Sequence, residues 1–288
     1  MCDSSSLYAG WKKKECEWKN KEVESESKIQ KLQQKVSQLK EAAAWSCSWD
    51  FHRSHYIYAG LQNGTLMVFD MCQTVKPVES LNGLSSNPIH TILSFSQKNT
   101  NRPRPVLTAS SIGLSLWNDD CREERPTLVP ESADEGVCIS LACSPNGDDI
   151  VATYRPKIDM STEVTPTQPS ANSSPISGQV TQGSHVLFKR AAGSNFLQKS
   201  GSMYANVSDI HLPRSAIVGS ENQNRFFAFG DEATNEVTLQ GLPSFSTSQR
   251  FKLKKHPLRD IKYTVAMNRG LITCLSDDIL QVFSRRQG

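Results

Sequence analysis

The feature that most constrains the fold of this chain is a unit of short β-type runs that recurs along most of its length. The first copy consists of runs at residues 45–50, 56–60, 65–70 and 77–81. The second and third runs are separated by Asn63-Gly64, and Asn-Gly between β-rich runs is the strongest local signal for a hairpin. A type I′ turn is expected there, and it requires positive φ at both central residues. The unit therefore predicts four short strands joined by turns.

Recurrence of this unit decides the fold class. Four later copies are marked by runs at residues 89–94, 106–110, 114–118, 137–143, 149–154, 185–189, 226–230, 236–240, 271–275 and 279–283. Ser144-Pro-Asn-Gly147 is interpreted as the turn between the first two strands of the third copy, because Pro and Gly favour the backbone angles that a turn needs. Third strands that end in an aromatic residue and a small or polar one match the Trp-Asp position of WD repeats, as at Phe69-Asp70, Trp117-Asn118 and Phe283-Ser284.

These observations predict a mainly β protein with a WD40-type β-propeller of about five blades over residues 45–284. No copy carries a literal Trp-Asp at the expected position, so the signal lies in the copies taken together. A β-sandwich is the alternative fold, but it predicts no period of roughly 40 residues.

Residues 11–44 differ in character, because from residue 12 they contain no Gly or Pro and are dense in Lys, Glu and Gln. Pairs such as Glu15 and Lys19 have the i, i+4 spacing that supports an exposed helix. The seam of a coiled coil follows at Ile29, Leu32, Val36, Leu39 and Ala43. We expect a helix that either pairs with a second copy of the chain or stays solvated. Residues 1–10 are polar and Ser-rich, and a disordered tail is expected there.

Residues 157–184 interrupt the third copy with a segment that has few large apolar residues. Such a segment buries too little surface to offset its ordering entropy, which predicts a disordered insertion between two strands. No early stretch joins a basic start to an apolar run, and no apolar segment approaches the ~20 residues of a membrane span. The chain is therefore expected to be soluble and intracellular, with no membrane partner.

Residues that could carry catalysis or hold a metal do not come together in this sequence. Eight cysteines occur without a C-x-x-C pair, whereas structural zinc needs four ligands that usually arrive in close pairs. The thiols are expected to be reduced and mostly buried. No nucleophile elbow, P-loop, dinucleotide fingerprint or His-Glu-x-x-His motif occurs, so we assign no catalytic residue, metal site or cofactor. The net charge of +3 is too small to predict nucleic-acid binding.

Partner binding is the remaining function, and one basic segment is a candidate for it. Lys252, Lys254, Lys255, His256 and Arg259 gather where the last strand of the fourth copy leads into the first strand of the fifth. Loops of that kind open on one rim of a propeller, where a basic patch can meet an acidic or phosphorylated partner. The alternative is a solvated surface without a particular partner.

Long strings of this sequence resemble a known family. Residues 44–64, which begin Ala-Trp-Ser-Cys-Ser-Trp-Asp and include Asp50 and Arg53, resemble the RING-finger and WD-repeat E3 ubiquitin ligases of the Fanconi-anaemia and replication-stress pathway, in their plant form. The resemblance covers most of the chain. It continues at Lys12-Lys-Lys-Glu-Cys-Glu-Trp-Lys19, Pro88-Ile-His-Thr91, Ala109-Ser-Ser-Ile-Gly-Leu114, Gly136-Val-Cys-Ile-Ser-Leu-Ala142 and Asp149-Ile-Val-Ala-Thr-Tyr-Arg-Pro156.

The resemblance implies an order of RING, coiled coil and propeller. The family's RING recruits an E2 enzyme, and its propeller holds substrates such as replication protein A, which binds single-stranded DNA. A nuclear role in the DNA damage response and in interstrand cross-link repair is implied as well.

This sequence departs from that plan in two ways. It lacks the zinc-binding RING cysteines, so no ligase site and no zinc carry over to any residue here. The chain alone is therefore expected to lack transfer activity and to meet an E2 only if a RING is supplied elsewhere. With about five blades where the family has about seven, we expect an incomplete propeller; the alternative is a smaller disc that closes. The alternative function is a non-enzymatic WD-repeat scaffold that oligomerises through its N-terminal helix.

Overall fold

The structure is a computed structural model that divides into two compact units, Met1–Ala43 and Ala44–Gly288. Its described residues are 12, 14, 15, 18–23, 26, 27, 42–51, 53–73, 75–94, 105–118, 125–144, 148–157, 183–190, 197–207, 212–219, 224–254, 257–266 and 269–286.

In the first unit, the described residues from 12 to 27 are helical, as the sequence predicts for this segment. Glu15 and Lys19 form the expected ion pair, with 3.0 Å between Lys19 Nζ and Glu15 Oε1. The tail at 1–10 and the seam residues between 29 and 39 lie outside the described residues, so the coiled coil stays a prediction. Ala43 is described and is not helical, and Ala44 already belongs to a strand.

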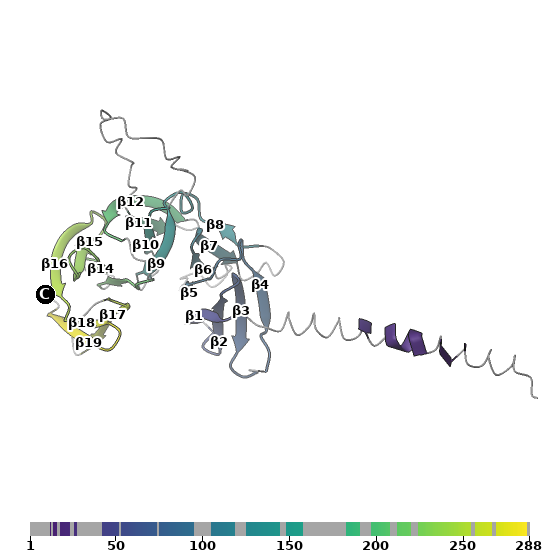
Figure 1. Ribbon diagram of the computed structural model, residues 1–288. Coiled ribbons are helices and arrows are strands. Elements are labelled where there is room, and N and C mark those ends of the chain that lie inside the picture. The colour runs from purple at the N-terminus through teal and green to yellow at the C-terminus, as the bar shows by residue number, and fades with distance from the viewer. Residues whose placement is uncertain are drawn as a thin grey trace, which may run out of the picture. The chain divides into compact units, whose positions relative to one another are not determined.

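The second unit contains five antiparallel sheets whose strands follow one another in chain order (Figure 1). The first sheet contains β1 (Ala44–Trp49), β2 (Tyr56–Leu61), β3 (Thr65–Asp70) and β4 (Glu79–Asn82). The second contains β5 (Thr91–Ser94), β6 (Pro105–Ser110), β7 (Gly113–Asn118) and β8 (Thr127–Leu128). The third contains β9 (Val137–Cys143), β10 (Asp149–Arg155), β11 (Gly183–Arg190) and β12 (Leu197–Ala205).

The fourth sheet contains β13 (Ala216–Val218), β14 (Phe226–Asp231), β15 (Glu236–Gly241) and β16 (Ser246–Lys252). The fifth contains β17 (Asp260–Ala266), β18 (Arg269–Leu275) and β19 (Leu280–Arg286). The predicted mainly β class is confirmed. The predicted insertion falls between the paired strands β10 and β11, and residues 158–182 lie outside the described part of the chain.

The turn after β2 lies where the sequence predicts it, but its type differs. The Gly64 amide donates a 3.2 Å hydrogen bond to the Leu61 carbonyl, and Gly64 has a φ of 79°. Asn63 does not have positive φ, so the predicted type I′ turn is wrong. A type I turn followed by a left-handed glycine satisfies the same hairpin, because the extra residue restores the strand register.

Apolar side chains fill each space between consecutive sheets. Tyr58, Leu66 and Val68 of the first sheet pack against Val106 and Trp117 of the second. Comparable cores join the second sheet to the third, the third to the fourth, and the fourth to the fifth. The first strands also pack on one another in sequence, β1 on β5, β5 on β9, β9 on β13 and β13 on β17. A single sheet of this kind would leave apolar side chains exposed to water. Stacking against a neighbour on each side buries both faces of the inner sheets.

Two buried polar side chains show how hydrogen bonds are satisfied within these cores. The Trp117 Nε1 proton is donated to Thr108 Oγ1 on the neighbouring strand at 2.8 Å. Ser46 of β1 donates to the Ile89 carbonyl at 2.6 Å, which fastens the first sheet to the approach to the second. Buried polar groups cost free energy unless they are paired, so these bonds also fix how neighbouring sheets meet.

Candidate functional site, a basic surface and a rigid turn

The predicted basic segment lies between β16 and β17, where the fourth sheet leads into the fifth. Lys252 ends β16 and Lys254 follows shortly after it, and both side chains are exposed. The Lys254 amide donates a 2.7 Å hydrogen bond to Oε1 of Gln281 in β19. Leu258 is buried in the core between the two sheets. The segment therefore presents its lysines from a backbone that is held on both sides. Lys255 and His256 lie outside the described residues.

Arg259 is tied into the fifth sheet. Its amide donates to the Leu275 carbonyl at 2.7 Å, and its Nε donates to Oδ1 of Asp277 at 2.6 Å. Asp277 lies in the turn between β18 and β19, which the Ser276 amide closes on the Ile279 carbonyl. Both partners of the ion pair are partly exposed, so solvent screens it and it adds little stability. It nevertheless offsets the charge that Arg259 brings to the surface.

Arg214 lies beside Arg259 along the backbone, which was not foreseen from the sequence. Its amide donates a 3.0 Å hydrogen bond to the Arg259 carbonyl, and its residue is exposed. The approach to β13 thus lies beside the approach to β17. This neighbourhood depends on how two sheets pack, and a single Arg in a loop gives no sequence signal for it.

We call Arg214, Lys252, Lys254 and Arg259 the basic patch. Arg214, Lys252 and Lys254 form no ion pair within the described residues, although Glu236 lies opposite Lys252 in the β15–β16 register. Three cations without a described partner favour an anionic ligand, and charge-assisted hydrogen bonds to carboxylate or phosphate are the strong ones. The patch can therefore bind an acidic or phosphorylated segment, but it has no arrangement for chemistry on it.

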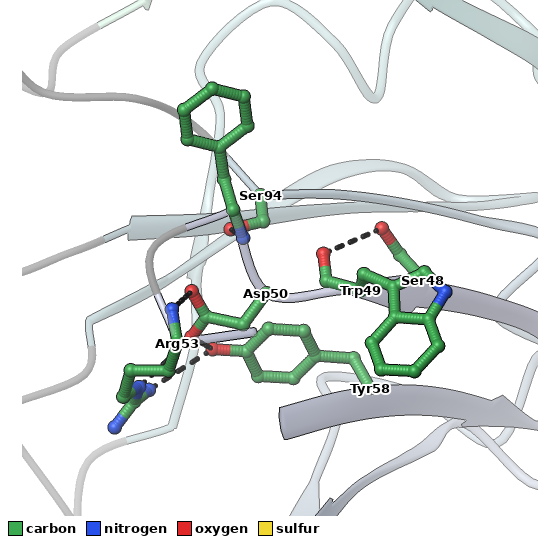
Figure 2. A network of polar contacts seen from close by, with 7 residues as sticks. Ser48, Trp49, Asp50, Arg53, Tyr58 and Ser94 are labelled. Carbon is green, nitrogen blue, oxygen red and sulfur yellow. Dashed lines mark hydrogen bonds and ion pairs between the residues drawn. The ribbon is translucent and has the colours of Figure 1, made fainter. Parts of the chain in front are cut away.

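A second feature is the turn between β1 and β2, which is organised by a buried carboxylate. Asp50 is 4% exposed. Its Oδ1 accepts a 3.0 Å hydrogen bond from the Arg53 amide, and its Oδ2 accepts from Arg53 Nε at 3.0 Å and from the Tyr58 hydroxyl at 2.8 Å. Figure 2 shows the side chains of Arg53 and Tyr58 directed at this carboxylate. Burial, and then the bond to Asp50, raise the pKa of Tyr58, so its phenol stays a donor.

The same turn carries exposed aromatic residues. Trp49 and Phe51 flank Asp50 and are 58% and 63% exposed. The Phe51 amide donates to Ser94 Oγ of β5 at 3.1 Å, and the Arg53 guanidinium lies 4.5 Å from the Tyr56 ring centroid. Trp, Tyr and Arg on a preorganised backbone are typical of binding hot spots. The sequence indicates a turn at this place but not the exposure of its aromatic residues.

Burial shifts the pKa of several described side chains outside the basic patch. Burial lowers the pKa of His90 to about 4 and of His185 to about 3. His90 Nε2 lies 3.1 Å from the Cys138 carbonyl, which can only accept, so Nε2 carries the proton of the neutral ring. Burial raises the pKa of the Cys138 and Cys143 thiols to about 12, which removes them as nucleophiles at neutral pH. The sequence predicts mostly buried thiols. Among the described cysteines, Cys47 and Cys72 differ from this prediction because they are exposed.

Within the described ranges, no group of three or more His, Cys, Asp or Glu side chains is placed to hold a metal ion. A search of the same residues finds no helix with the length and apolar character to cross a membrane.

Repeated antiparallel sheets that stack through apolar faces, with a Trp–Thr bond across two strands, define a WD-repeat β domain.

Comparison with known proteins agrees with this class. Residues 28–284 match the model of the family described as the E3 ubiquitin-protein ligase RFWD3 WD40 domain, and the chain belongs to this family. The human E3 ubiquitin-protein ligase RFWD3 is 24% identical over 245 residues, which are 83% of this chain and 30% of that protein. The protein of the same name from Ailuropoda melanoleuca is 27% identical over 116 residues, 39% of this chain and 15% of that protein. The chain thus spans less than a third of the length of these relatives.

Proposed function

We propose that this chain is the substrate-binding WD-repeat portion of a RING-type E3 ubiquitin ligase that acts in the nucleus, in the DNA damage response and in interstrand cross-link repair. The observation that carries the proposal is the family match over residues 28–284. The relatives are named as E3 ubiquitin-protein ligases, and the matched domain is their WD40 domain. In this proposal the five sheets are the blades of an incomplete propeller.

The basic patch is the proposed contact surface for substrate. Lys252 and Lys254 are exposed on a fixed backbone, and Arg214 adds a third cation from the neighbouring segment. Complementary charge steers association and selects among partners, so an acidic or phosphorylated surface is favoured. Replication protein A is the proposed substrate, and an E2 enzyme meets the complex only through a RING supplied elsewhere.

Calorimetric titration of the full chain with replication protein A tests the substrate. Lys252→Glu combined with Lys254→Glu is expected to weaken binding by roughly tenfold or more, because two favourable charges become unfavourable ones. Lys76→Glu, which reverses one charge instead of two, is a control at an exposed lysine in the first sheet's β3–β4 connection, and should bind as the wild type does. Equal weakening by the control would assign the effect to net charge. No binding by the wild type would favour a generic scaffold that oligomerises through its N-terminal helix.

The catalytic part of the proposal is tested separately. The purified chain, supplied with ubiquitin, E1 and E2 enzymes and ATP, is expected to form no polyubiquitin. Substrate binding should not require a RING-bearing relative. Ubiquitin transfer should occur only when such a relative is added. Polyubiquitin formed by this chain without another E3 enzyme would contradict the proposed division of labour.

A further inference from the structure

The fifth sheet holds the basic segment between β16 and β17 at both of its described ends. The Lys254 amide donates a 2.7 Å hydrogen bond to Oε1 of Gln281 in β19. The Arg259 amide donates to the carbonyl of Leu275, the last residue of β18, at 2.7 Å. Leu258 is buried in the core that joins the fourth and fifth sheets. The backbone that carries Lys254 and Arg259 is therefore fixed by the β18–β19 hairpin.

The turn of the same hairpin also holds the side chain of Arg259, through a single nitrogen. Arg259 Nε donates to Asp277 Oδ1 at 2.6 Å, and among the described residues this is the one hydrogen bond of the Arg259 side chain. The terminal nitrogens Nη1 and Nη2 are not engaged by it. In a guanidinium group these nitrogens form a planar fork that matches two oxygens of a carboxylate or a phosphate. The contact with Asp277 thus leaves the fork to a ligand.

A carboxylate beside a binding cation can act in two opposite ways. It competes with the ligand if it occupies the donors that the ligand needs, and it assists binding if it orders the cation beforehand. Here Asp277 bonds Nε and not the fork, from a turn that the Ser276 amide closes on the Ile279 carbonyl at 2.9 Å. An ordered arginine loses less conformational entropy when a ligand binds. The geometry therefore favours the assisting role.

Charge favours a phosphate group as the ligand of this fork. The pair of Arg259 and Asp277 is neutral as a whole, so the attraction for an anion also depends on the other cations of the basic patch. Lys252, Lys254 and Arg214 form no ion pair within the described residues. A phosphorylated side chain carries about −1.5 to −2 charge at pH 7 and three strong acceptor oxygens. It therefore gains more from several cations than a single carboxylate does.

We propose that Asp277 is a positioning residue of the basic patch, which holds the Arg259 guanidinium so that its fork receives the phosphate of a phosphorylated partner. Asp277 acts through Arg259 and contacts no ligand itself. The inference rests on the proposed function, because it specifies the chemistry by which the basic patch binds its substrate. It does not depend on which protein carries the phosphate.

Fluorescence anisotropy of the full chain with short labelled peptides tests the ligand class. One peptide carries a phosphoserine between glycines, and matched peptides carry serine or glutamate at that place. The wild type is expected to bind the phosphopeptide roughly tenfold more tightly than either matched peptide. Arg259→Lys keeps the charge but loses the fork, and should weaken phosphopeptide binding by roughly tenfold. A glutamate peptide bound equally well, no binding of the phosphopeptide, or an unchanged affinity in Arg259→Lys would overturn the proposal.

Two substitutions at Asp277 test its role with the same phosphopeptide. Asp277→Ala should weaken binding by on the order of three- to tenfold, because the guanidinium must then be ordered by the ligand. Asp277→Asn keeps an acceptor oxygen for Arg259 Nε and should stay within about twofold of the wild type. Both variants lose the same charge, so this difference isolates the positioning contact. Asp134→Ala is the matched control, at an exposed aspartate in the β8–β9 connection, and should bind as the wild type does.

The result with Asp277→Ala decides the proposal. Tighter binding would show that Asp277 competes with the ligand, and unchanged binding would show that it has no role, so either outcome overturns the positioning role. The ion pair is partly exposed and adds little stability, so the urea midpoints of both variants should match that of the wild type. If calorimetry detects no binding of replication protein A while these phosphopeptide results hold, the proposed substrate fails and the role of Asp277 stands.

Discussion

At the scale of single residues, Asp50 shows how a buried charge is made compatible with a folded core. A carboxylate removed from water destabilises the fold unless hydrogen bonds replace its hydration. Here the Arg53 amide, Arg53 Nε and the Tyr58 hydroxyl all donate to it. The network joins the turn after β1 to the interior of β2, so the position of Trp49 and Phe51 depends on it.

Removal of this carboxylate is expected to destabilise the protein. Asp50→Ala should lower the free energy of unfolding by about 3 kcal/mol, because it leaves buried donors without an acceptor. Tyr58→Phe deletes one bond to the charged group and should cost about 2 kcal/mol. Urea denaturation followed by circular dichroism measures both. A change below about 0.5 kcal/mol in Asp50→Ala would mean that the network does not hold the turn.

The two buried histidines predict how stability depends on pH. Their folded pKa values, about 4 for His90 and about 3 for His185, lie below the ordinary value of 6.5. Below pH 6.5 the unfolded chain therefore binds protons that the folded chain excludes, and stability falls as pH falls. Each histidine should remove up to about 2 kcal/mol between pH 6.5 and pH 5.

Substitution at His185 tests this assignment. His185→Gln is expected to lower stability at pH 7, because Nδ1 loses its 2.9 Å contact with Thr153 Oγ1. The same variant should lose less stability than the wild type between pH 6.5 and pH 5. Urea midpoints measured across this range report both effects. A pH slope unchanged in both His185→Gln and His90→Gln would contradict the proposed titration.

At the scale of elements, Gly64 shows where the chain leaves no room for a side chain. Its φ of 79° disfavours other residues, and an added Cβ would lie 2.0 Å from the Ser85 carbonyl oxygen. Gly64→Ala should therefore destabilise the first sheet by about 2 kcal/mol or more. Gly201→Ala is the control, because nothing lies within 4 Å of its added Cβ. It should be neutral or slightly stabilising in thermal denaturation.

A melting temperature unaffected by Gly64→Ala would show that the turn and the Ser85 segment can move apart. Loss of stability in Gly201→Ala to the same extent would indicate that any added methyl group is harmful, whatever the backbone conformation.

The strands predicted best from the sequence are two long strands of the third sheet that are buried on both faces. Val137–Cys143 has the predicted bounds, and β10 differs from its prediction by one residue. Strands that are buried on both faces show nearly continuous apolar runs, which are easy to recognise in a sequence. β8 and β13 were not predicted, because two or three residues carry no periodicity. β12 was missed for another reason, since its outward residues are polar and it contains Gly201.

At the scale of the whole molecule, the recurring unit could be recognised from the sequence but the surface could not. A period in the sequence predicts repeated sheets because each repeat needs a neighbour to bury its apolar face. The lysines at 252 and 254 could be named from their clustering. Arg214 became part of the basic patch only through a backbone bond to Arg259.

The central claim is that this WD-repeat domain binds its substrate through the basic patch. Hydrogen–deuterium exchange of the full chain, with and without replication protein A, tests it most directly. The account predicts slower exchange in residues 212–215 and 252–259 of the complex, with residues 75–82 unchanged. Protection confined to other segments, or no protection at saturating partner, would contradict it.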